Sequence, residues 1–177
     1  MNEGTFPVVY LSLLVGMLSI AAIFLFRQVL RTRRVEIRLN RLQADLKTGK
    51  GAAKDYYELG SIFLDKRLYA QAITEYQKAL KAKDLEGDDN KAVLLNALGY
   101  AYAAQEQFDL AIRNYKDALD RQPGYVTALN NLGFAYEKKQ LIAQAVEAYE
   151  GALKTEPSNK VAKRRAEALR KRLVPSA

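Results

Sequence analysis

The side chains that most often carry catalysis or bind metals are missing from this chain. Its 177 residues include no histidine and no cysteine. Imidazole is the commonest general base and metal ligand, and a disulfide or a thiolate site needs cysteine. The adjacent carboxylates Asp88 and Asp89 fall in a stretch predicted to be a loop, which cannot hold two acids in a catalytic geometry. Glycine-rich phosphate loops and nucleophile elbows are also missing. We therefore expect no enzyme activity, no cofactor, no metal and no small-molecule substrate.

A repeat organises the remaining polar and aromatic side chains. The segment Asn96-Ala-Leu-Gly-Tyr-Ala-Tyr102 aligns with Asn130-Asn-Leu-Gly-Phe-Ala-Tyr136 after a shift of 34 residues. An earlier copy begins at Tyr57-Glu-Leu-Gly-Ser-Ile-Phe63, 39 residues before the second, and Asp84 stands where the later copies have Pro123 and Pro157. The other recurring positions are Ala72, Ala111 and Ala145, then Tyr76, Tyr115 and Tyr149, and Ala79, Ala118 and Ala152.

These residue types predict pairs of packed helices. The glycines Gly60, Gly99 and Gly133 remove a side chain where two helices press together, and the recurring alanines do the same on the second helix. The recurring tyrosines supply the bulk that fills the gap to the next repeat, and the prolines end the second helix.

This period and this order of residues resemble the tetratricopeptide-repeat (TPR) family over residues 53–159. The resemblance implies an all-α solenoid of three helical hairpins, in which the first helices line a concave groove that binds peptide. It places the groove positions three residues before and one residue after each glycine, with an equivalent in the cap. These positions are Tyr57, Ser61, Asn96, Tyr100, Asn130, Phe134 and Arg164. The two asparagine amides can pair with a ligand backbone, although a solvated helix face without a ligand is the alternative.

One branch of the family binds chaperone C-termini through a clamp of Lys, Asn and Arg. The clamp positions here are Tyr57, Ser61, Ala97, Thr127 and Asn131. The basic members are missing, which argues against a chaperone adaptor.

The end of a solenoid needs a cap, because no repeat can bury its apolar face alone. The stretch from Lys160 to Leu173 is predicted to be that helix. Its docking stripe is Ala162, Ala166, Leu169 and Leu173.

The N-terminal region predicts a membrane anchor. Pro7 to Phe26 is free of charged residues, and a helix of that length spans roughly 30 Å, the thickness of a bilayer core. A cleaved signal peptide would need a positive start and small residues at its end, and a buried core helix would be shorter or show a polar face. The arginines that follow would lie at the membrane surface and keep the repeats in the cytoplasm or stroma. They are Arg27, Arg31, Arg33, Arg34, Arg38 and Arg41.

The helix is expected to continue beyond the membrane to residue 48, before a hinge at 47–51. Its apolar stripe of Val35, Leu39, Leu42 and Leu46 would pack on the first repeat, or form a short coiled coil with a partner. Charge is concentrated in two flanks, +7 over residues 27–54 and +6 over 160–177, around a middle of −4 over 55–159. A uniformly basic surface would indicate nucleic acid; two separate flanks do not.

The layout as a whole resembles the membrane-anchored photosystem I assembly TPR proteins of cyanobacteria and chloroplasts. That resemblance implies a thylakoid protein that binds photosystem I subunits or intermediates as a scaffold. The alternative is a general bacterial membrane adaptor or a scaffold for an envelope complex. The predicted order is an N-terminal segment and transmembrane helix (1–26, span 7–26), a basic linker helix and hinge (27–52), repeat 1 (53–86), an acidic loop insertion (87–91), repeat 2 (92–125), repeat 3 (126–159) and a basic capping helix and tail (160–177).

Overall fold

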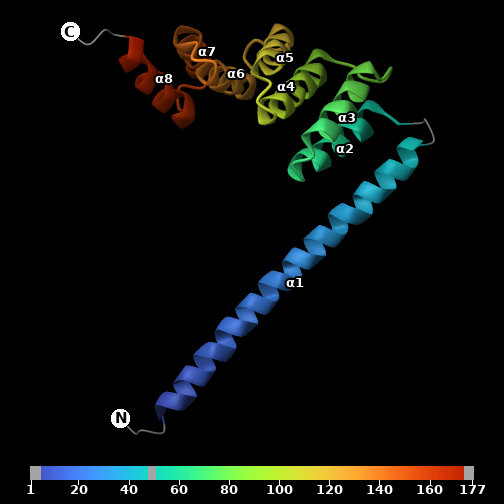
Figure 1. The fold of residues 1–177 in the computed structure, drawn as a ribbon, viewed down its shortest axis with the longest axis vertical. Coiled ribbons are helices and arrows are strands. Elements are labelled where there is room, and N and C mark those ends of the chain that lie inside the picture. Colours follow the sequence, from blue (N-terminus) through green and yellow to red (C-terminus); the bar gives the residue numbers. More distant parts are fainter. Residues whose placement is uncertain (1–4, 48–50, 174–177) are drawn as a thin grey trace. The chain divides into compact units, whose positions relative to one another are not determined.

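The computed structural model describes residues 5–47 and 51–173, and of residues 5–9 it describes the backbone only. Within these ranges the chain forms eight helices and no strand (Figure 1). The chain divides into two units, one ending at Ala44 and the other beginning at Asp45. Most of the predicted hinge at 47–51 lies outside the described residues.

The first unit is built on one long helix, α1 (Thr5–Lys47). From Tyr10 to Phe26 its side chains are exposed and carry no charge. Within this stretch the Ser19 hydroxyl donates to the Val15 carbonyl oxygen at 2.8 Å, so this polar group has a partner inside the helix. A bare apolar helix of this length is long and apolar enough to cross a membrane. The six arginines follow in the same helix and are all exposed.

The second unit is a stack of helical hairpins (Figure 1). The main packing is between helices that follow one another in the chain. At the turn inside each hairpin a non-glycine residue takes a positive φ: Arg67, Glu106 and Gln140, at 59–61°. The helices are α2 (Ala53–Asp65), α3 (Tyr69–Lys81), α4 (Asp88–Ala104), α5 (Phe108–Arg121), α6 (Val126–Lys138), α7 (Ile142–Thr155) and the cap α8 (Lys160–Leu173). The chain is thus an apolar N-terminal helix followed by an α-solenoid of three hairpins and a capping helix.

A tyrosine packed on a glycine closes each hairpin. A Cβ added at Gly60 would come within 2.6 Å of the Tyr76 ring, and one at Gly133 within 2.8 Å of the Tyr149 ring. Real Cβ atoms essentially never come so close, so only glycine fits. The Tyr149 ring also packs in one cluster with Ala162 and Ala166 of α8. The prediction that these tyrosines reach the next repeat is confirmed there.

Two details differ from the sequence-based expectation. Ala162, Ala166 and Leu169 are buried as predicted, but Leu173 is 47% exposed, because it lies in the final turn of α8 beyond the packed stripe. The acidic insertion is largely helical, since α4 begins at Asp88. Acidic residues in a first helical turn are favoured by the helix dipole, which explains the early start.

Candidate partner-binding groove

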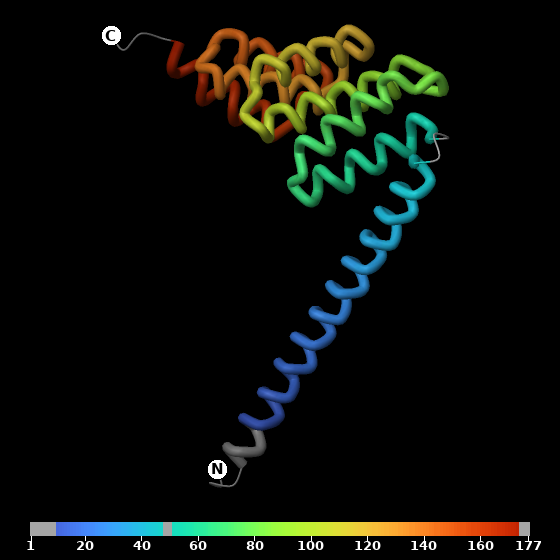
Figure 2. Tube along the Cα trace, turned by 45° about the vertical axis from the view of Figure 1, so that its right-hand side comes forward, coloured from blue at the N-terminus to red at the C-terminus, as the bar shows by residue number. Residues whose placement is uncertain are grey.

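The first helices of successive hairpins lie next to one another, with α4 in contact with both α2 and α6 (Figure 2). The predicted groove residues sit on these helices as pairs four residues apart, and such pairs share one helix face. The solenoid therefore presents them as successive steps of one surface.

The aromatic members of this surface are available to a partner. Tyr100 on α4 is 51% exposed and Phe134 on α6 is 39% exposed. The ammonium nitrogen of Lys138 lies 5.4 Å from the centre of the Phe134 ring, which places a cation over its face. Arg164 is exposed on α8. The surface thus offers aromatic contact along its middle and positive charge toward the cap.

Asn96 has a structural role that its sequence position does not reveal. It is only 9% exposed, and its amide oxygen accepts a hydrogen bond from the Asn131 amide at 2.9 Å. Its amide nitrogen donates to the Tyr125 hydroxyl at 3.5 Å. Both partners lie at or beyond the start of α6, so this group ties α4 to α6. Less of its hydrogen-bonding capacity remains for a ligand than the sequence indicates.

Tyr125 belongs to the same surface and was missed by the sequence reasoning. Burial raises the pKa of its hydroxyl, the nearby Tyr57 hydroxyl raises it too, and the Asn96 hydrogen bond lowers it. Tyr125 could have been identified from its position directly before α6, where a bulky residue lies next to the groove face.

Ser61 and Tyr57 are half-buried, and their contacts lie mainly within the first hairpin. The Ser61 hydroxyl donates to the Tyr57 carbonyl oxygen at 2.9 Å and lies 3.2 Å from the Tyr76 hydroxyl. The Tyr57 and Tyr76 rings are 5.7 Å apart, centre to centre. Asn130 differs: its amide oxygen is buried and accepts no hydrogen bond within the described part of the chain. A buried acceptor of this kind normally has a donor.

Stacked helical hairpins with such a surface on their first helices define a TPR protein. Family models described as tetratricopeptide repeat match residues 52–124 and 96–160. The uncharacterized protein ycf37 of Guillardia theta is 37% identical over 120 residues, which cover 68% of this chain and 67% of that protein. The chloroplastic TPR domain-containing protein PYG7 of Arabidopsis thaliana is 39% identical over 165 residues. That match covers 93% of this chain and 54% of PYG7, so the chain spans about half of that relative.

This chain belongs to the TPR family, in the group that contains the ycf37 proteins and PYG7. Among solved structures, the first TPR of Spaghetti (RPAP3), bound to the HSP90 peptide SRMEEVD, is 25% identical. It superposes with a TM-score of 0.63 over 68% of this chain and 92% of that one. The fold is thus that of a module for binding protein partners.

Proposed function

We propose that this protein is a membrane-anchored scaffold that binds a photosystem I subunit or assembly intermediate during photosystem I assembly. The anchor is α1, in the thylakoid membrane, and the repeats face the cytoplasm or stroma. One observation carries the proposal: the match to the chloroplastic relative PYG7 covers 165 of the 177 residues, or 93% of the chain, so it extends beyond the repeats into the apolar helix.

The proposed binding surface is the groove on α2, α4, α6 and α8. A client segment would lie across the exposed rings of Tyr100 and Phe134. Its backbone would pair with the side chain of Asn130, a partly exposed residue, and an acidic side chain would face Arg164 at the cap end. The aromatic rings supply apolar contact area and the polar groups fix the direction of the segment.

The groove chemistry does not favour a chaperone tail. The peptide SRMEEVD in the related solved structure is acidic. The clamp positions of this chain carry hydroxyl, amide and methyl groups, not cations. We expect no binding of SRMEEVD to this protein.

Co-purification tests the proposal. The tagged full-length protein is isolated from mildly solubilised membranes, and bound proteins are identified by mass spectrometry. We expect photosystem I subunits with the wild type and a loss of roughly tenfold or more with Tyr100→Ala plus Phe134→Ala. The matched control is Leu110→Ala on α5, where the leucine is 42% exposed but lies on a second helix.

Two results would contradict the proposal. Recovery of envelope-complex subunits in place of photosystem I would support the adaptor alternative. Full client retention by a correctly folded double variant would show that the groove is not the working surface.

A further inference from the structure

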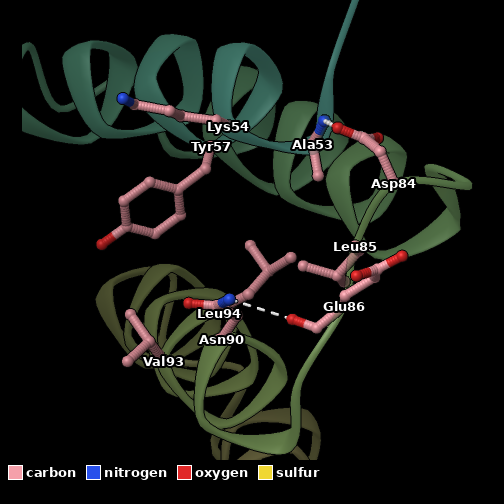
Figure 3. A pocket seen from close by; sticks show the side chains of 9 residues that line it. All are labelled: Ala53, Lys54, Tyr57, Asp84, Leu85, Glu86, Asn90, Val93 and Leu94. Atoms are coloured by element: carbon pink, nitrogen blue, oxygen red, sulfur yellow. Dashed lines mark hydrogen bonds between the residues drawn. The ribbon is translucent and has the colours of Figure 1, made fainter.

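The loop between the first and second hairpins has a defined shape. Both carboxylate oxygens of Asp84 accept from the backbone N–H of Ala53, at 3.0 and 3.1 Å. The Asn90 amide donates to the Glu86 carbonyl oxygen at 2.9 Å (Figure 3). Gly87 takes a φ of 80°, which favours glycine. The residue that replaces the usual proline thus fastens the loop to the start of α2.

This loop closes one end of a cavity of about 280 Å³ between α2 and α4. Figure 3 shows Tyr57 on the α2 side, Val93 and Leu94 on the α4 side, and Leu85 coming from the loop. Most of these lining groups are apolar. A cavity of roughly 150 Å³ is enough for a benzene ring. The cavity is therefore large enough for one leucine or phenylalanine side chain.

The part of the groove between α4 and α6 differs from the part between α2 and α4. There Asn96 occupies the position equivalent to Tyr57, and the protein's own Tyr125 lies against it. Tyr125 enters from a short turn that includes Pro123, whereas the longer first loop places its own side chains at the end of the cavity. The insertion thus distinguishes the first step of the groove from the second.

The charges around the cavity are unequal. Its lining contains the carboxylates of Asp84 and Glu86 and the ammonium group of Lys54. The Asp84 carboxylate is engaged by the N-terminus of α2, while Glu86 is exposed. Asp89 follows in the first turn of α4 and adds negative charge on that side, whereas the carboxylate of the neighbouring Asp88 is paired with Arg121 at 3.0 Å. A basic group is the complementary neighbour for this edge.

We propose that the cavity is an anchoring subsite of the groove, which receives one leucine- or phenylalanine-sized side chain of the client segment. A lysine or arginine next to that side chain in the client faces Glu86. This assignment rests on the proposed function, because Tyr57 belongs both to the cavity lining and to the groove. It extends the proposed function by naming the two adjacent residues that the client must contain, one large and apolar and one basic.

Defined peptides test the subsite. The probes are fluorescein-labelled nine-residue peptides with Leu, Phe or Ser at the centre, each followed by Lys or Glu. Binding to the full chain in nanodiscs is measured by fluorescence anisotropy. We expect the Leu–Lys and Phe–Lys peptides to bind at least tenfold more tightly than Ser–Lys, and Glu86→Lys to reverse the preference for Lys over Glu.

Val93 offers a substitution with a close control. It is 38% exposed on α4, and Val161 is 51% exposed on the cap helix, two repeat lengths further along. Val93→Trp should fill the cavity entrance and weaken Leu–Lys binding at least tenfold. Val161→Trp should change it less than twofold. Circular dichroism melts check that both variants fold.

Equal affinity for Leu and Ser peptides, absence of measurable binding by every Leu and Phe peptide, or unchanged affinity in Val93→Trp would each overturn the subsite. Client co-purification tests separately whether the groove binds the client. If client co-purification still depends on Tyr100 and Phe134, only the subsite is wrong. If it does not depend on them, the proposed function fails as well.

Discussion

At the residue scale, the glycine–tyrosine contacts can be tested by adding one methyl group. Gly133→Ala would place its Cβ 2.8 Å from the buried Tyr149 ring, so it should destabilise the protein by about 1–3 kcal/mol through overpacking. Gly151→Ala is the control, because its Cβ would meet only the end of the flexible Leu129 side chain, at 3.2 Å. It should change stability by less than about 1 kcal/mol. Thermal melts followed by circular dichroism measure the change in melting temperature of both variants. Equal shifts in the two variants would contradict the contact between Gly133 and the Tyr149 ring.

The buried tyrosines should also make stability depend on alkaline pH. Burial raises the pKa of Tyr76 to about 12, against a smaller lowering by its hydrogen bond with Ser61. The folded state therefore favours the protonated phenol. That contribution is complete below the ordinary tyrosine pKa of about 10 and is lost as the pH rises toward 12. Urea melts between pH 9 and 12 should show this fall, and Tyr76→Phe should reduce it. An identical pH profile in that variant would contradict the assignment.

The sequence predicted a close helix contact at each of these glycines, because they recur at corresponding positions of the three copies. It assigned the tyrosines to the gap with the next repeat, and it did not predict that each ring packs on the glycine of its own hairpin. The link between Asn96, Asn131 and Tyr125 could not be predicted in this way. Its members are 29 and 35 residues apart, and the first repeat has no equivalent asparagine pair. Side-chain direction, which no period encodes, decides whether such an amide faces a ligand or a neighbouring helix.

At the element scale, α8 should be required for the stability of the third hairpin. It covers Ala145, Tyr149 and Ala152 of α7 with apolar side chains, and Arg170 pairs with Glu150 at 2.6 Å. Removing residues 160–177 would expose that apolar face, whereas Lys171→Ala, at an exposed position of the same helix, would not. We expect a lower melting temperature and binding of a hydrophobic dye for the deletion alone. Equal behaviour of the two would contradict a capping role. The sequence located this helix from its stripe, but it extended the stripe one turn too far, to Leu173.

At the scale of the whole molecule, the arginines that follow the apolar part of α1 should fix its orientation. All six lie on its C-terminal side, so we predict that the repeats face the cytoplasm or stroma. Protease added to sealed vesicles of known orientation checks this. Digestion of the repeats from the cytoplasmic side is expected, with a lumenal marker protein as the protected control. Protection of the repeats would contradict it. The long apolar helix was predictable from the sequence, because the stretch from Pro7 to Phe26 contains no charged residue.

The packing of each helix mainly on its chain neighbours governs how the repeats come apart. In such a linear array, local units can unfold from either end while the middle stays folded, much as a zipper opens. A client lying across all the first helices would bind only when every hairpin is formed. Its binding free energy would then couple the hairpins, so the bound protein should melt in a single sharp transition while the free protein melts over a broad range. The width of the melting curve would therefore report occupancy of the groove without any label on the client.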